Sequence, residues 1–312
     1  MKQLIRSAAA RLVLMLPRSV LTDAALFNRY QDRGIHIQPV HFYSPVPDTR
    51  ELGPDVFTRR TELRGIDRRE AEQVAVLSSP EFRKHLAEFR TFEAHAESQG
   101  APLAFGPLDG AMLYHMVRNH RPRRIVEVGC GSSTRIIAEA IRANGGLAKG
   151  GYFRSIDPYP RDFIMAGEVP FVEMTESIVQ DIPLSDFEEL DAGDMLFIDS
   201  THVVKINSDV VFEINEVFPR LAGGVHVHVH DIYLPLEYDR DFVLKRKIFW
   251  NEQYMLQAFL AFNDAFEITW SAGIAREVFP EKVAALIPEF DPAMQQAGSL
   301  WFRRKTEAER RA

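Results

Sequence analysis

The stretch Arg124-Ile-Val-Glu-Val-Gly-Cys-Gly-Ser-Ser133 decides the fold of this chain. Residues 125–128 predict a short buried strand, and Gly129 and Gly131 predict a tight turn after it. Residues 133–143 then carry apolar side chains at helical spacing and predict a helix. Because glycine has no Cβ and a helix N-terminus offers free N–H groups, such a strand–turn–helix unit is typical of nucleotide-binding sites.

The glycine spacing indicates which kind of nucleotide is bound. The motif is Glu127-x-Gly-x-Gly, and Thr134 stands where the third glycine of the dinucleotide pattern Gly-x-Gly-x-x-Gly would be. A pyrophosphate clamp is therefore a poorer fit than a smaller adenosyl ligand. We expect Glu127, Ser132 and Ser133 beside that ligand. Cys130 lies where the turn needs a small residue, which favours a packing role over a catalytic thiol.

The composition is that of a globular protein and argues against several functional classes. The chain has 312 residues, of which 46% are hydrophobic and 26% charged, and length alone suggests about one to two domains. A net charge of −7 argues against a nucleic-acid-binding protein, which usually has a basic face, so we expect no nucleic-acid partner. The single cysteine excludes an intrachain disulfide and fits a reducing compartment, so we expect a cytoplasmic protein.

The N-terminal segment is apolar and flanked by basic residues. Residues 7–17 lie near Lys2, Arg6 and Arg11, and the apolar run is far shorter than the roughly 20 residues of a spanning helix. Arg11 also interrupts the apolar region that a signal peptide needs. We therefore expect no transmembrane segment. An amphipathic helix that packs on the body of the protein is the favoured interpretation, and peripheral contact with a membrane surface is the alternative.

From Arg124 onward, predicted strands and helices alternate, which indicates a parallel sheet with helices on both faces. We expect strands at 125–128, 152–156, 171–179, 195–198, 224–230, 266–270 and 299–303. We expect helices at 67–99 with a break at 79–80, and at 111–119, 133–143, 186–190, 209–220 and 251–262. Prolines exclude a regular helix from residues 38–47. This divides the chain into an N-terminal helical and irregular extension, residues 1–100, which would be a substrate-side cap or packing region, and a sheet domain, residues 101–312.

Polar side chains follow two of the predicted strands, and the carboxyl ends of parallel strands face the ligand crevice. Asp157 ends the strand 152–156, where it can accept hydrogen bonds from both ribose hydroxyls of an adenosyl ligand. A turn or capping role before Pro158 is the alternative. Asp199 and His202 follow the strand 195–198 and fit a metal ligand and a general base, whereas the alternative is that His202 caps the next helix.

The segment Gly223-Gly-Val-His-Val-His-Val-His-Asp231 alternates histidines with valines. A period of two places His226, His228 and His230 on one face of a strand. A central strand is normally apolar, so we expect the two inner histidines to be hydrogen-bonded core residues or packing residues. His226 and His230 would lie about 13 Å apart, which is too far for them to share one metal ion.

Only the end of this strand reaches the crevice, so His230 and Asp231 join His202 as catalytic candidates. Asp199, His230 and Asp231 form the candidate metal site. Carboxylates suit Mg²⁺, and the histidine favours Mn²⁺, Fe²⁺ or Zn²⁺.

Four segments, taken in order, resemble the motifs of class I S-adenosylmethionine-dependent methyltransferases. They are Glu127-Val-Gly-Cys-Gly131, Ile156-Asp157, Phe197-Ile-Asp-Ser200 and His228-Val-His-Asp-Ile232. The resemblance spans residues 101–305 and is greatest to a bacterial group with a His-x-His-Asp-Ile block followed by Leu-Pro. The chain is also similar, more distantly, to metal-dependent O-methyltransferases, which carry an acidic pair after the fifth strand; here His230 replaces the first acid.

The resemblance implies a Rossmann-like, seven-stranded, mostly parallel sheet of order 3-2-1-4-5-7-6, with S-adenosylmethionine as cofactor and a divalent metal as a further candidate. It implies that Gly129 and Gly131 lie against the methionine part of the cofactor, with Asp157 on the ribose. Gln180 and Asp181 match the place where such enzymes hold the adenine, and Asp199 also faces the cofactor.

Methyl transfer to a hydroxyl requires a base or a metal. We expect His202 or His230 as the base, with Asp199 and Asp231 orienting it or binding a metal. The expected acceptor is a sugar or another small hydroxyl-bearing molecule. The alternatives are an NAD(P)-dependent oxidoreductase, a non-catalytic cofactor-binding module and, more remotely, a metal-dependent hydrolase. The oligomeric state has no signature in the sequence.

Overall fold

A computed structural model describes residues 11, 13–291 and 297–311. The chain divides into two compact units, residues 1–56 and residues 57–312. The division thus falls before the position near residue 100 that the sequence indicates, because the helices at 70–98 belong to the larger unit. The role of residues 1–100 as a substrate-side cap stays a prediction.

The first unit is short of packed structure. Among its described residues, 11 and 13–15 are helical. The helices α2 (Arg18–Leu21) and α3 (Ala24–Gln31) follow, and α4 (Pro54–Thr58) crosses the boundary of the unit. As expected, residues 38–47 are not helical. None of its described residues, 11 and 13–56, is buried. The amphipathic helix expected near residues 7–17 lies partly outside the described residues.

In the described part of the larger unit, seven strands form one sheet with the order β3-β2-β1-β4-β5-β7-β6, as predicted. The first five strands in this order are parallel to one another, and β7 runs antiparallel to both β5 and β6. The strands are β1 (Arg124–Val128), β2 (Tyr152–Ile156), β3 (Val172–Thr175), β4 (Met195–Ile198), β5 (His226–Val229), β6 (Phe266–Ser271) and β7 (Leu300–Arg304). Because β2 and β4 flank β1 on opposite sides, the strand order reverses there, and a ligand crevice forms at such a point.

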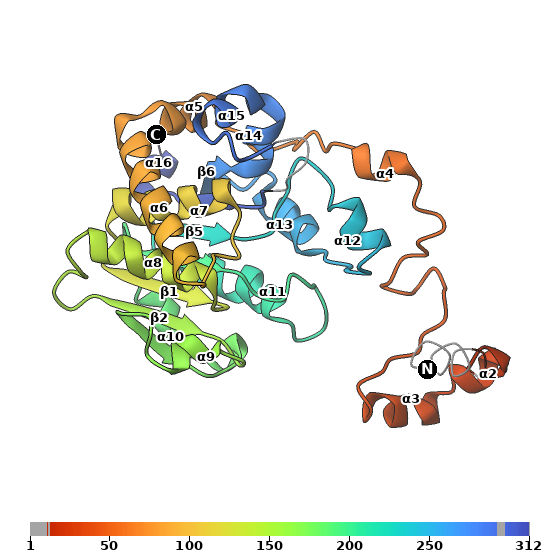
Figure 1. Ribbon diagram of the computed structural model, residues 1–312. Helices are drawn as coiled ribbons and strands as arrows, with labels where there is room; N and C mark the ends of the chain where they lie inside the picture. The colour runs from red at the N-terminus through yellow and green to blue at the C-terminus, as the bar shows by residue number, and fades with distance from the viewer. Residues whose placement is uncertain (1–10, 12, 292–296, 312) are drawn as a thin grey trace. The chain divides into compact units, whose positions relative to one another are not determined.

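Helices follow the strands as alternation predicts (Figure 1). Before and after β1 come α5 (Glu70–Ser78), α6 (Pro80–Ser98), α7 (Pro107–His120) and α8 (Ser132–Ala143). The later helices are α9 (Asp162–Met165), η1 (Val179–Asp181), α10 (Leu184–Glu188), α11 (Asp209–Phe212), α12 (Arg240–Leu244), α13 (Glu252–Leu260), α14 (Ala272–Val278), α15 (Pro280–Leu286) and α16 (Glu307–Arg311).

The predicted helices at 67–99 and 209–220 are interrupted in different ways. The first breaks at the predicted Ser79-Pro80, where the Ser79 hydroxyl accepts a hydrogen bond from the Phe82 N–H (3.0 Å) and caps α6. The second changes from α11 into a π-helix, η2 (Glu213–Val217), and a 3₁₀ turn, η3 (Phe218–Arg220). Pro219 has no N–H to donate within a continuous α-helix, which accounts for the tighter last turn.

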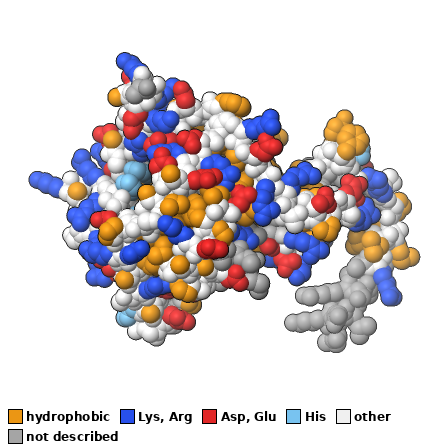
Figure 2. All heavy atoms as spheres, turned by 90° about the horizontal axis from the view of Figure 1, so that it is seen from above, with side chains coloured by type: hydrophobic (Ala, Val, Ile, Leu, Met, Phe, Trp, Pro, Cys, Tyr) orange, Lys and Arg blue, Asp and Glu red, His pale blue; other side chains and the backbone are white. Residues whose placement is uncertain are grey.

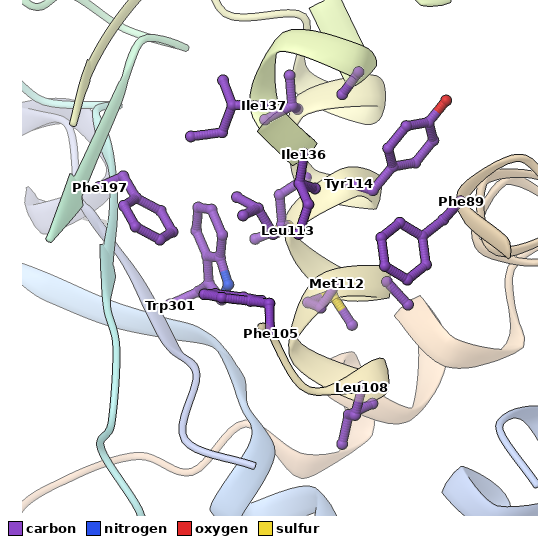
Figure 3. Close-up of a cluster of buried hydrophobic side chains, with 14 of the residues drawn as sticks. Phe89, Phe105, Leu108, Met112, Leu113, Tyr114, Ile136, Ile137, Phe197 and Trp301 are labelled. Carbon is purple, nitrogen blue, oxygen red and sulfur yellow. The ribbon is translucent and has the colours of Figure 1, made fainter. Parts of the chain in front are cut away.

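The sheet has an apolar cluster on each face, because neighbouring strand residues point in opposite directions. On β4, Phe197 belongs to the cluster under α6, α7 and α8, whereas Ile198 belongs to the cluster under η2 and α13. Figure 3 shows the first cluster, in which rings from α6, α7, β4 and β7 meet. Each large side chain buried there contributes roughly 1.5–3 kcal/mol to folding. On the outside, Figure 2 shows acidic and basic side chains interspersed over the face it displays.

The inner histidines of β5 lie in the core, as expected, and pack there through their rings. His228 is fully buried and stacks on Phe197 (centroids 4.2 Å apart), with Trp301 at 4.7 Å. Neither of its ring nitrogens has a partner among the described residues. Burial lowers the pKa of His228 well below its usual value, so the ring is neutral and packs as an aromatic residue. His226 similarly contacts the His120 ring (3.9 Å), and burial lowers its pKa to about 3.

Among the described residues, no helix has both the length and the apolar character required to cross a bilayer.

Candidate active site

The turn after β1 contains two glycines with different requirements. Gly129 has φ +84°, and a Cβ there would collide with the backbone carbonyl of Asp199. This glycine therefore lets the ends of β1 and β4 come together. A Cβ on Gly131 would meet no atom within 4 Å, so the space beside Gly131 is open to a ligand.

Glu127 stabilises the turn through buried hydrogen bonds. Its carboxylate is fully buried and accepts hydrogen bonds from the hydroxyls of Ser133 (2.8 Å), Thr134 (2.8 Å) and Ser155 (2.7 Å). Burial raises the pKa of Glu127 to about 7, against the lowering effect of these hydroxyls. In the structure Glu127 and Ser133 thus hydrogen-bond to each other and stabilise the turn. Direct contact of either residue with a cofactor stays a prediction.

Asp157 lies at the carboxyl end of β2 and reaches across to the β1 turn. One of its oxygens accepts from the Cys130 N–H (2.9 Å), and the other accepts from the Tyr159 N–H (2.7 Å). Each carboxylate oxygen retains capacity for a further hydrogen bond. Burial raises the pKa of the Cys130 thiol to about 12, which fits the packing role expected for it.

A cavity of about 390 Å³ opens at the ends of β1, β2 and β4. Of the predicted cofactor residues, Gly129, Asp157, Gln180 and Asp199 line this cavity, and Gln180 donates a hydrogen bond to the Asn207 carbonyl (2.9 Å). Sequence reasoning missed further lining residues, among them Tyr159, Ile178 and Lys205; they lie in loops, where no periodicity marks them. The volume is within the range of small-molecule sites.

The remaining predicted cofactor residues lie outside this lining. Ser132 accepts a hydrogen bond from the Ala104 N–H (2.8 Å), which ties the loop before α7 to the start of α8. Asp181 is exposed at the end of η1. Their contact with a cofactor stays a prediction.

His202 lies beside the cavity and is surrounded by carboxylates. Its Nδ1 is 2.9 Å from Glu252 Oε2, and its Nε2 is 3.3 Å from Asp199 Oδ1 and 3.6 Å from Asp231 Oδ2. Burial would lower its pKa, but the hydrogen bonds with Asp199 and Glu252 raise it well above 6.5. His202 and Asp231 have φ values of +60° and +54°. Non-glycine residues in this conformation are strained and concentrate at functional sites.

Glu252 is the functional candidate that sequence reasoning missed. It is 1% exposed at the first position of α13, and burial raises its pKa. The one signal in the sequence is an acid two residues after Trp250. The Trp250 ring packs edge-on against His202, with centroids 4.7 Å apart. A second buried acid, Glu213, accepts a hydrogen bond from Ser200 (3.1 Å), and burial raises its pKa well above the usual value.

His230 occupies a different position from His202. Its ring stacks on Phe105 (4.3 Å), and its Nε2 is 4.0 Å from Asp231 Oδ1. Asp231 also accepts a hydrogen bond from the Tyr233 hydroxyl (2.5 Å). The ligand atoms that the structure brings within 4.8 Å of one another are those of Asp199, His202 and Asp231. The sequence suggested His230 as the histidine of this group, but in the structure that histidine is His202.

Comparison with known proteins agrees with this geometry. Residues 126–232, from β1 to the end of β5, match the family model described as a methyltransferase domain. The matched residues include the glycine turn, Asp157, Asp199, His202 and Asp231.

Several proteins are similar to this chain. An uncharacterised protein of Archaeoglobus fulgidus is 29% identical over 172 residues, which are 49% of this chain and 73% of that protein. The O-methyltransferase TomG of Streptomyces achromogenes, involved in tomaymycin synthesis and solved with S-adenosylmethionine, is 17% identical over 77% of this chain and 100% of its own, with a TM-score of 0.42. An O-methyltransferase of Bacillus cereus solved with S-adenosylhomocysteine is 15% identical over 71% of this chain and 91% of its own, with a TM-score of 0.40.

Proposed function

We propose that this chain transfers the methyl group of S-adenosylmethionine to a hydroxyl oxygen of a small acceptor, with a saccharide as the favoured class. One observation carries the proposal. Asp199 lines the cavity at the ends of β1, β2 and β4, and it also lies 3.3 Å from His202 Nε2. The cofactor cavity and the acid–base group are therefore adjacent, as methyl transfer to a hydroxyl requires.

The cavity has the chemistry of an adenosyl site. We assign the ribose to Asp157, whose oxygens retain acceptor capacity, and the adenine to the wall formed by residues 177–180. The methionine part would lie against the open side of Gly131. NAD(P) fits less well, because Thr134 takes the third glycine position and its hydroxyl donates to Glu127.

The reaction is an in-line displacement. The acceptor oxygen attacks the methyl carbon, the carbon–sulfur bond breaks with its electron pair remaining on sulfur, and the acceptor loses its hydroxyl proton. We assign that proton to His202, whose Nε2 lies on the side of Asp199 and Asp231 and whose Nδ1 is fixed by Glu252. Holding oxygen and methyl in line contributes about 7–11 kcal/mol in well-oriented reactions.

A divalent metal is a second candidate for activating the acceptor. The donor set fits, because two carboxylates and an imidazole nitrogen lie within 4.8 Å of one another, and Glu252 orients the imidazole from behind. A divalent cation bound there would lower the pKa of an acceptor hydroxyl. Asp199, Asp231 and Glu252 each have a carboxylate oxygen within 3.6 Å of a His202 ring nitrogen, and this excess of acidic groups favours a cation.

Calorimetry and methyl transfer together test the proposal. We expect S-adenosylhomocysteine to bind, and Asp157→Ala to weaken binding roughly tenfold or more, because a charged hydrogen bond to the ribose is lost. Glu168→Ala, which removes an exposed acid that does not line the cavity, is the control. Absence of binding by the unaltered protein would overturn the assignment, and binding of NAD instead would support an oxidoreductase.

Radiolabelled methyl transfer to a panel of free and nucleotide-linked sugars tests the base. We expect His202→Ala to slow transfer at least roughly tenfold while S-adenosylhomocysteine binding is retained, and His230→Ala to have the smaller effect. Activity that survives the loss of His202 but disappears with a chelator would favour the metal. Cofactor binding without transfer to any acceptor in cell extract would favour the non-catalytic module.

We also infer that the chain belongs to the bacterial group with the His-x-His-Asp-Ile block. The residues of this block make different contacts: His228 packs in the core, His230 stacks on Phe105, and Asp231 lies beside His202.

A further inference from the structure

The first unit carries a set of apolar side chains with no core to bury them. Val13, Leu14, Met15 and Leu16 are consecutive and exposed, with Leu14 at 81% and Met15 at 79%. No residue of the described part, 11 and 13–56, is buried, so the unit has no interior of its own there. Exposed apolar side chains concentrated in this way mark a surface that another body covers.

The charges around this segment are all of one sign. Residues 1–22 contain Lys2, Arg6, Arg11 and Arg18 and no acidic residue, whereas the whole chain has a net charge of −7. Basic residues interleaved with large apolar ones are typical of segments that lie in the interface of an anionic bilayer. A nucleic acid would attract the same charges but would not cover Leu14 and Met15.

Aromatic side chains of the same unit are exposed as well. Phe42 is 82% exposed and Tyr43 is 83% exposed. Phe42 shares with Arg18 and Leu21 the lining of a hollow of about 810 Å³, so residues distant in sequence border one surface of this unit. Aromatic rings are enriched at the level of lipid headgroups.

We propose that the first unit docks the enzyme on an anionic lipid bilayer, with Val13–Leu16 inserted among the acyl chains and Arg11 and Arg18 on the headgroups. The contact is peripheral and holds the methyltransferase domain at a membrane surface. It does not depend on the proposed reaction, because none of these residues belongs to the cavity at the ends of β1, β2 and β4.

Vesicle co-sedimentation of the full chain tests this. We expect binding to vesicles of phosphatidylcholine with phosphatidylglycerol, little binding to phosphatidylcholine alone, and weakening as salt screens the charges. Arg11→Ala with Arg18→Ala should lower the partition coefficient roughly thirtyfold, at about fivefold for each basic residue. The matched control, Arg83→Ala with Lys84→Ala, removes two exposed basic residues from α6 and should leave binding nearly unchanged.

The apolar contribution is tested by Leu14→Glu with Met15→Glu, which should abolish binding. Met165→Glu, at an exposed methionine of α9, is the control and should bind normally. Binding that survives Leu14→Glu with Met15→Glu would overturn the proposal, as would absence of binding to the anionic vesicles. Self-association of the full chain that this double substitution abolishes would assign the segment to a second copy instead, and equal binding to a DNA duplex would assign it to nucleic acid.

Discussion

Glu127 fixes the geometry of the β1–α8 turn by hydrogen bonds, but its burial makes ionisation of its carboxyl group unfavourable. Three hydroxyls meet its carboxylate, yet burial still raises its pKa to about 7. The folded protein therefore binds this proton more tightly than the unfolded chain, whose glutamate titrates near 4.5. Stability is then greatest below pH 4.5 as far as this group is concerned, and it falls as pH rises from 4.5 to 7.

Replacing Glu127 by glutamine removes this titration. Between pH 5 and pH 8 we expect the unfolding free energy of Glu127→Gln to rise relative to that of the unaltered protein by about 2–3 kcal/mol, because the ionisation penalty disappears. Urea denaturation at the two pH values measures the difference. Glu81→Gln, at an exposed acid of α6, is the control. Parallel stability curves for Glu127→Gln and the unaltered protein would show that Glu127 titrates normally in the fold.

In the proposed reaction, Glu252 influences proton transfer through His202. Its carboxylate is one of the two hydrogen-bond partners that raise the pKa of His202, against the lowering effect of burial. A base must be unprotonated, so methyl transfer that uses His202 increases as pH rises through this raised pKa. Glu252→Gln keeps a hydrogen-bond partner but removes the negative charge. We expect the rise in kcat/KM to move to lower pH by about one unit or more, with S-adenosylhomocysteine affinity unchanged. A lower rate at every pH with the same profile would assign Glu252 a structural role alone.

At the scale of elements, the two glycines of the β1–α8 turn have different predicted roles, Gly129 in the fold and Gly131 in ligand binding. Gly129 has φ +84° and faces the Asp199 carbonyl, whereas Gly131 is extended and faces open space. We expect Gly129→Ala to destabilise the protein by about 1–3 kcal/mol or more, because it adds both backbone strain and a collision. Gly131→Ala should leave the melting temperature unchanged and weaken S-adenosylhomocysteine binding. Thermal unfolding and calorimetry on the same two variants distinguish the roles, and equal behaviour of the pair would contradict them.

The sequence predicts elements well where a pattern is strong and local. The strands at 125–128, 152–156 and 195–198 lie within a residue of their predicted bounds, because buried parallel strands are short apolar runs. The strand expected at 171–179 is shorter, Val172–Thr175, and α9, α12, α14 and α15 were not expected. His228 satisfies its burial by ring stacking, and Glu252 reaches His202 from 50 residues away. Both depend on tertiary contacts that no local pattern records.

At the scale of the whole molecule, the stabilising core and the reaction site belong to the same unit. Both apolar clusters consist of residues from Leu63 onward, and every residue lining the cavity at the ends of β1, β2 and β4 lies between 128 and 209. The described residues of the first unit contribute none of this buried surface. Apolar burial is the main favourable term in folding, so the two units should differ sharply when they are made separately.

We expect residues 57–312 to unfold in one cooperative transition, with a melting temperature within about 4 °C of the full chain, since a larger shift would require the loss of more than about 1 kcal/mol. This fragment should bind S-adenosylhomocysteine as the full chain does. Residues 1–56 alone should show no cooperative transition, because residues 11 and 13–56, the part that the structure describes, bury no side chain to offset the conformational entropy of folding. Circular dichroism during heating of the two fragments measures both. A broad, non-cooperative melt of residues 57–312 would mean that the first unit stabilises the sheet through contacts that the larger unit's own core does not supply.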